Sequence, residues 1–192
     1  MTENRIIIEG SGRHIHLSQA HLESLFGAGF QLTAKKYLSQ PGEFASESRL
    51  DIAGPKGKIT GVCVLGPTRP QTQVELSCTD AKLLGIACPV RESGNLAGSA
   101  PCTLIGPVGT VELTEGAIIA KRHIHLTPED AARFGVSDKE VVQVEVEGDR
   151  ALVFDQVIVR VSPKYATYMH IDYDEINAAG LTGQVTGLVR KK

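Results

Sequence analysis

One short stretch occurs twice in this chain of 192 residues. Residues 13–18 read Arg-His-Ile-His-Leu-Ser, and residues 122–127 read Arg-His-Ile-His-Leu-Thr. If each copy is a β-strand, its two histidines share one face, because the side chains of a strand alternate between faces. Two neutral imidazoles side by side supply half of the ligands of a tetrahedral zinc site. A single His-x-His could equally be a surface pair on a strand edge. Two copies with matching flanks favour one local geometry used twice, and therefore two metal-binding halves.

The segments that follow the two copies also match. Each copy leads to an N-cap residue, Ser18 or Thr127, and then to a short helix that ends at Gly27 or Gly135. Alternating strands around Gly-containing turns then predict a hairpin in each half. Many short strands with Gly/Pro turns and few helices are typical of β-barrels. We therefore expect a mainly β chain of two tandem β-barrel domains from an internal duplication, with a few short helices.

The repeat also predicts domain boundaries. We expect residues 1–88 to form the first β-barrel half and residues 117–192 to form the second. Residues 89–116 begin as a polar, Gly-rich connection and end in a further hairpin, which could pack into either barrel. Small barrels leave strand edges that need cover, so we also expect a homodimer.

The ends of the two halves align through Thr72 and Thr167, each of which lies three residues before a possible metal ligand. Each half then offers three candidate ligands, a number typical of catalytic zinc with an open fourth position. The candidate zinc ligands are His14, His16 and Glu75 in the first half and His123, His125 and His170 in the second. We therefore expect two zinc ions per chain. The remaining histidine, His21, aligns with Asp130 and is expected on the helix surface.

Composition excludes several other classes of protein. The net charge of −2 argues against nucleic-acid binding. No apolar run approaches the length of a bilayer-spanning helix, and the N-terminus has no signal-peptide layout. The cysteines lack metal-site spacing, so we expect reduced, half-buried small hydrophobes in a cytoplasmic protein. These four cysteines are Cys63, Cys78, Cys88 and Cys102.

Five motifs, in order along nearly the whole chain, resemble the PduL-type phosphate acyltransferases. They are residues 11–17, 38–45, 66–75, 121–131 and 169–175. The resemblance implies interconversion of acyl-CoA plus phosphate with acyl phosphate plus CoA, with propionyl-CoA or acetyl-CoA as substrate. It also implies two β-barrel domains, a homodimer and a dinuclear zinc centre on the six ligands named above. The family's catalytic arginine falls on Arg69.

The same resemblance implies further contacts and a cellular context. The CoA-binding positions of the family fall on Ser11, Lys36, Leu65 and Asn177. Many members carry an N-terminal peptide that directs them to a bacterial microcompartment. This chain begins close to its first strand, so we expect no encapsulation peptide and a cytoplasmic location, with a microcompartment as the other possibility.

Three functions are compatible with such a site. No Ser–His–Asp layout or reactive cysteine suggests an acyl-enzyme, so we favour direct transfer to phosphate, with Arg69 binding phosphate or stabilising the thioester oxyanion. The equivalent residue of the second half, Lys164, is expected to be a solvated charge. A two-zinc thioesterase or other hydrolase would use the same ligands to activate water. A non-catalytic zinc-binding barrel protein would have no need of Arg69.

Overall fold

The computed structural model describes residues 4–192, which divide into two units. The C-terminal unit combines residues 4–11, 39–41 and 121–192, and the N-terminal unit combines residues 12–38 and 42–120. Residues 1–3, on which the expectations about a targeting peptide and the start of the first half partly rest, lie outside the described residues. Among residues 4–192, no helix has the length and apolar character needed to cross a membrane.

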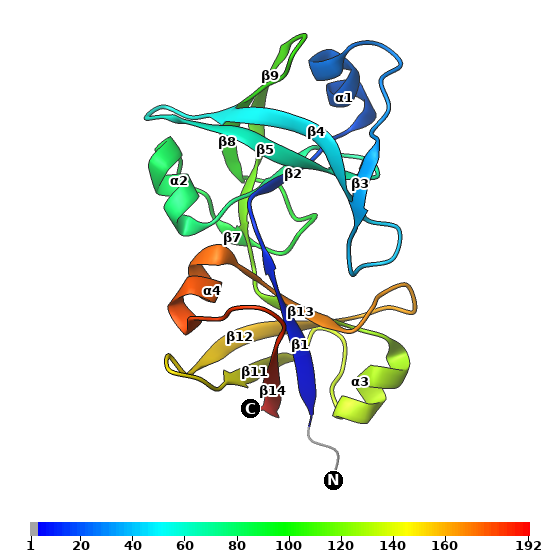
Figure 1. Cartoon of the computed structure of the whole chain (residues 1–192), viewed down its shortest axis with the longest axis vertical. Coiled ribbons are helices and arrows are strands. Elements are labelled where there is room, and N and C mark those ends of the chain that lie inside the picture. Colours follow the sequence, from blue (N-terminus) through cyan, green and yellow to red (C-terminus); the bar gives the residue numbers. More distant parts are fainter. Residues whose placement is uncertain (1–3) are drawn as a thin grey trace. The chain divides into compact units, whose positions relative to one another are not determined.

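The C-terminal unit is a closed six-stranded barrel. In barrel order its strands are β1 (Arg5–Ser11), β13 (Tyr168–Asp172), β10 (His123–Leu126), β12 (Leu152–Val161), β11 (Val141–Val146) and β14 (Val185–Lys191). β1 pairs in parallel with β13 and antiparallel with β14, so the first strand of the chain lies beside the last (Figure 1). Alternate residues of these strands, such as Ile6, Ile8, Val142 and Val144, fill the apolar core.

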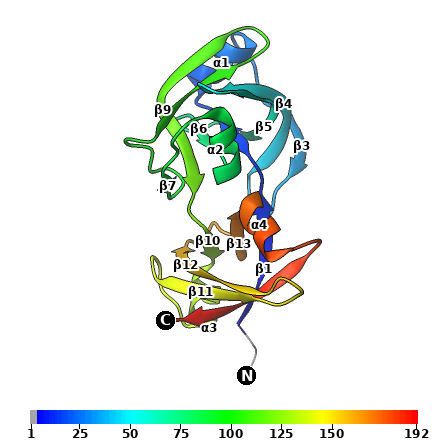
Figure 2. The same cartoon turned by 90° about the vertical axis from the view of Figure 1, so that its left-hand side faces the viewer.

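The N-terminal unit contains a second closed ring of six strands. In ring order they are β4 (Phe44–Ala53), β5 (Lys58–Gly66), β2 (His14–His16), β6 (Gln73–Glu75), β9 (Thr110–Ala120) and β8 (Ala100–Ile105). β8 closes the ring because it pairs with both β9 and β4. Two short strands, β3 (Ala34–Tyr37) and β7 (Val90–Arg91), extend this sheet (Figure 2). The expectation of a mainly β chain with two barrels is confirmed.

The duplication is visible in the strand pairing. β2 lies between a parallel neighbour, β5, and an antiparallel neighbour, β6. β10 lies in the same way between β12 in parallel and β13 in antiparallel orientation. The two His-x-His strands therefore occupy equivalent places in their own barrels, as the repeat predicts.

The division of the chain differs from the expected boundaries at residues 88 and 117. β1 precedes the first His-x-His strand in the sequence but pairs with β13 and β14 of the C-terminal unit. β9, which contains Ile118 and Ile119, precedes the second His-x-His strand but pairs with β6 and β8 of the N-terminal unit. The physical reason is ring closure, because β9 in one barrel and β1 in the other fill the place beside β6 or β13 and pair with it in parallel. The hairpin within residues 89–116 belongs to the N-terminal unit.

Short capped helices connect the strands. α1 (Gln19–Phe26) and α3 (Pro128–Phe134) are capped by Ser18 and Thr127, as expected. α2 (Cys78–Leu84) and α4 (Tyr173–Ala179) begin at capping boxes formed by Ser77 with Asp80 and by Asp172 with Glu175. Side-chain caps of this kind stabilise a helix by about 1 kcal/mol each, which matters for helices of only seven or eight residues.

The cysteines only partly match the expectation of half-buried small hydrophobes. All four are free thiols, and Cys63 and Cys88 are half-buried. Cys102 is fully buried, whereas Cys78 is exposed because it lies at the first position of α2. Burial raises the pKa of Cys88 to about 11 and that of Cys102 to about 12.

Candidate active site

The first predicted ligand set comes together on two adjacent strands of the N-terminal unit. His14 and His16 lie on β2, and Glu75 on β6 is the direct register partner of His14. Directly opposed residues of an antiparallel pair share a face, so the strand pairing itself brings the carboxylate to the imidazoles. All three side chains are buried, and one potential ligand atom from each lies within 4.8 Å of the others.

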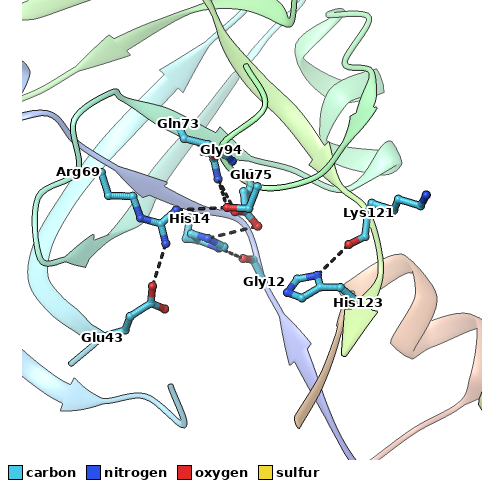
Figure 3. A network of polar contacts seen from close by, with 10 residues as sticks. Gly12, His14, Glu43, Arg69, Gln73, Glu75, Gly94, Lys121 and His123 are labelled. Atoms are coloured by element: carbon cyan, nitrogen blue, oxygen red, sulfur yellow. Dashed lines mark hydrogen bonds and ion pairs between the residues drawn. The ribbon is translucent and has the colours of Figure 1, made fainter. Parts of the chain in front are cut away.

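A backbone hydrogen bond fixes the orientation of the His14 ring. Its Nδ1–H donates to the backbone carbonyl of Gly12 at 2.8 Å, and its Nε2 lies 3.5 Å from Oε2 of Glu75 (Figure 3). Because a carbonyl only accepts, Nδ1 carries a proton, and Nε2 is therefore the nitrogen through which the neutral imidazole could bind a metal. Burial disfavours protonation of His14, but the Glu75 carboxylate outweighs this effect and raises the pKa of the imidazole.

His16 is held as a neutral imidazole. Burial, followed by the charges of His14 and Arg69, lowers its pKa well below the ordinary value. Its Nδ1 is buried and makes no hydrogen bond with any residue from 4 to 192. Leaving a buried polar atom unsatisfied costs about 1–3 kcal/mol. A buried donor set of two imidazoles and one carboxylate fits a zinc ion, which takes neutral histidine nitrogen and carboxylate oxygen.

The second predicted set comes together within the C-terminal unit. His123 and His125 lie on β10, and His170 on β13 is the direct register partner of His123. The three ring centroids are 4.7–5.3 Å apart. His123 Nδ1 lies 2.8 Å from the carbonyl of Lys121, which repeats the contact of His14 with Gly12 (Figure 3). The same backbone contact therefore orients the first histidine of both sets.

In the second set, His125 and His170 also contact residues outside the set. The ring of His125 stacks on Tyr165, with ring centroids 4.1 Å apart. His170 places Nε2 3.4 Å from the amide nitrogen of Gln40 and Nδ1 4.0 Å from Glu9 Oε2. Among the described residues, the first set is the group of three whose ligand atoms all lie within 4.8 Å of one another. The second set contains three imidazoles and no carboxylate. Zinc also accepts three histidine nitrogens, so the donor types of this set fit zinc as well.

Arg69 extends from the loop before β6, and its backbone N–H donates to the carbonyl of Leu17 at 2.8 Å. Its guanidinium donates to Glu43 Oε1 at 2.9 Å (Figure 3). It also donates to Ser93 Oγ at 3.2 Å. The side chain is 30% exposed, so it can still meet a ligand that arrives from solvent. Lys164, at the equivalent repeat position, is exposed, in agreement with its expected role as a solvated charge.

Sequence reasoning missed the residues that hold this arginine and Glu75. Gln73 donates to Glu75 Oε1 at 2.5 Å and to Ser93 Oγ at 2.8 Å. The sequence could have indicated Gln73, because it lies two residues before Glu75 on β6 and residues two apart on a strand share a face. Ser93 lies in the Gly-rich stretch that the sequence indicated only as a connection, and nothing local marks it as a partner of Arg69.

The contacts of the aligned threonines agree with the repeat and correct the expected position of His21. Thr72 Oγ1 lies 2.8 Å from Nδ1 of His21, and Thr167 donates to Asp130 at the equivalent place. His21 is half-buried by this contact, so it is more than the helix-surface residue that was expected.

The expected CoA-binding residues are distributed over both units. Ser11 ends β1 and Asn177 is exposed on α4, both in the C-terminal unit. Lys36 is exposed on β3, and Leu65 on β5 is the register partner of His16, both in the N-terminal unit. Their contact with CoA stays a prediction.

Comparison of the sequence with known proteins identifies the family of this chain. The sequence model of the phosphate propanoyltransferase family matches residues 7–182. A phosphate propanoyltransferase of Enterococcus faecalis is 53% identical over 189 residues, which cover 98% of this chain and 90% of that protein. The chain is 50% identical to a phosphate propanoyltransferase of Listeria monocytogenes over 192 residues, covering 100% of this chain and 90% of the relative. A phosphate propanoyltransferase of Thermotoga maritima is 51% identical over 189 residues, or 97% of this chain and 90% of the relative. The chain therefore belongs to the phosphate propanoyltransferase family of acyltransferases.

Proposed function

We propose that the chain transfers a short acyl group, propanoyl or acetyl, between CoA and inorganic phosphate in both directions. The names of its relatives support the propanoyl group, and a pocket distinguishes propanoyl from acetyl by only about 1–3 kcal/mol per methylene. The observation that carries the proposal is the buried set His14, His16 and Glu75 with Arg69 tied into the same hydrogen-bond network.

The six predicted ligands would hold two zinc ions per chain, as the dinuclear centre of the family implies. His14, His16 and Glu75 would hold one ion, and His123, His125 and His170 would hold the other. Bound zinc supplies Lewis-acid binding for the oxygens of phosphate, which is strongly hydrated in water. The donor types and burial of the first set and the matched orientation of His14 and His123 support this assignment.

The transfer proceeds directly, without an acyl-enzyme. A phosphate oxygen attacks the thioester carbonyl carbon, the C–S bond breaks, and CoA leaves as a thiolate that takes up a proton. Arg69 offers five N–H donors in a planar fork, two of which are bound to Glu43 and Ser93. The remaining donors suit the oxygens of phosphate or the oxyanion that develops on the carbonyl.

The test is release of CoA from propionyl-CoA and acetyl-CoA, measured with and without phosphate. An acyltransferase releases CoA only when phosphate is present and forms acyl phosphate in equal amount. A two-zinc thioesterase would release CoA and free acid without phosphate, and a non-catalytic zinc-binding protein would release none. Either of these results would overturn the proposal.

We also propose that the protein is a cytoplasmic homodimer. All four residues of β3 are exposed, and β3 pairs with β4 at one end of its sheet. An edge strand of this kind offers unpaired backbone groups to a second chain. Light scattering over a wide concentration range tests the oligomeric state, and a monomer throughout would contradict it. Cell fractionation tests the location against a microcompartment.

A further inference from the structure

Gln73 is an uncharged side chain buried beside the predicted ligands. It lies on β6, is 1% exposed, and is the register partner of His16. Its amide makes three hydrogen bonds. Nε2 donates to Glu75 Oε1 at 2.5 Å, and Oε1 accepts from the N–H of Gly94 at 2.7 Å (Figure 3). Nε2 also donates to Ser93 Oγ at 2.8 Å.

These partners allow only one orientation of the amide. The backbone N–H of Gly94 can only donate, so it requires the amide oxygen of Gln73 on its side. Both hydrogens of Nε2 are then directed at Glu75 and Ser93. A flipped amide would direct its oxygen at the Glu75 carboxylate and leave two N–H groups without acceptors, which is costly at a buried position.

The fixed amide distinguishes the two oxygens of Glu75. Oε1 accepts from Gln73, whereas Oε2 lies on the side of His14, 3.5 Å from its Nε2. His14 is itself held by Gly12, so the facing atoms of both side chains are fixed by contacts from outside the pair. Partners of this kind orient a ligand before the metal arrives and raise affinity.

We propose that Gln73 is a positioning residue that fixes Glu75 so that Oε2 alone is offered to zinc. This inference rests on the proposed function, because it takes Glu75 as a zinc ligand. The equivalent residue of the second repeat is Tyr168, the register partner of His125. Tyr168 has no amide, so the positioning contact belongs to the first set and should affect one zinc ion of the two.

The experiment measures the zinc affinity of the purified chain by competition with a chromophoric chelator. Gln73→Met removes the amide at nearly constant volume, and Gln73→Asn keeps an amide that is too short to reach both Glu75 and Ser93. Loss of an outer hydrogen-bond partner typically weakens metal binding 10–100-fold. We expect such a decrease for one of two zinc ions in both variants. Cobalt(II) bound in place of zinc should show a changed visible spectrum, because the carboxylate is no longer held.

Tyr168→Phe is the matched control, because it removes one hydroxyl at the equivalent repeat position. We expect it to leave both zinc affinities within about twofold of the parent chain. If Gln73→Met destabilises the fold, as thermal melting would show, Gln73→Asn gives the answer with its polar group retained.

The outcomes separate this inference from the proposed function. If the parent binds two zinc ions and both folded Gln73 variants bind them equally tightly, the positioning role is wrong and the zinc assignment stands. If Glu75→Ala binds both zinc ions as tightly as the parent, Glu75 is not a ligand, and both the zinc assignment and the inference are overturned.

Discussion

Removal of the Arg69 side chain should separate catalysis from folding and from metal binding. Arg69→Ala deletes the bonds to Glu43 and Ser93 but keeps the backbone bond from residue 69 to the carbonyl of Leu17. The ion pair with Glu43 is about one-third exposed on both sides, and such pairs contribute roughly 0–1 kcal/mol to stability. The free energy of unfolding should therefore fall by no more than about 1 kcal/mol.

The effect on turnover should be much larger. A donor that stabilises charge developing in the transition state commonly contributes about 2.7–4 kcal/mol, or a hundredfold to a thousandfold in kcat. We expect Arg69→Ala to lose that factor in phosphate-dependent CoA release while keeping both zinc ions. Arg69→Lys should recover little, because an ammonium cannot reproduce the planar fork. Glu75→Ala should differ in kind, because it should lose zinc as well as activity.

The assay is steady-state CoA release, with zinc content and thermal melting measured on the same preparations. Lys164→Ala is the control, because Lys164 occupies the equivalent repeat position and is exposed, and it should stay within a few-fold of the parent. Near-normal activity of Arg69→Ala would refute the role given to this arginine. In that case Arg13 and Arg122, beside the His-x-His pairs, become the candidates for charge stabilisation.

Three further predictions concern the ligands, the network and the thiols. His14→Ala and His125→Ala should each lose about one of two zinc ions by elemental analysis, and full retention in both would contradict the ligand sets. Ser93→Ala should keep its zinc, because Gln73 retains its bonds to Glu75 and Gly94, but should lower kcat by about tenfold, because Arg69 loses one of its two side-chain acceptors; unchanged kcat would show that the hydroxyl is dispensable. Iodoacetamide at pH 8 should leave Cys88 and Cys102 unmodified in the folded chain, because burial raises the pKa of these thiols to about 11 and 12 and keeps them protonated at that pH. Mass spectrometry that finds either residue modified before unfolding would count against this.

Much of the site could be predicted from alternation and repetition. The two-residue period of a strand placed His14 and His16 on one face, and the alignment of Thr72 with Thr167 identified Glu75 as the third residue of the set. The structure makes Glu75 the register partner of His14, so the alignment found a contact across 61 residues of chain. The same reasoning was successful for His123 and His170.

Two features lay beyond such patterns. Alternation assigns a residue to a face but does not say which strand lies alongside, so β1 and β9 were grouped with the wrong His-x-His strands. The contact between Ser93 and Arg69 joins two loops, and a serine in a Gly-rich stretch has the same local signature whether or not it meets a distant arginine.

The two halves share the contacts around their His-x-His strands but differ in the charge of their predicted ligands. Arg13 pairs with Asp80 at 2.9 Å, and Arg122 pairs with Glu175 at 2.6 Å, so the residue before each His-x-His strand binds the acidic group of a capping box in its own unit. The third predicted ligand, in contrast, is a carboxylate in one set and an imidazole in the other. A divalent ion would keep about one positive charge beside Glu75 and about two among three neutral imidazoles. Counting the ligands alone, the two sets would therefore attract phosphate unequally under the proposed function, with the stronger attraction at the second set, where the Glu9 carboxylate 4.0 Å from His170 reduces the difference. The N-terminal set, which would have the weaker charge, is the one that has Arg69 in its network, and this guanidinium, although paired with Glu43, keeps further N–H donors for the oxygens of phosphate.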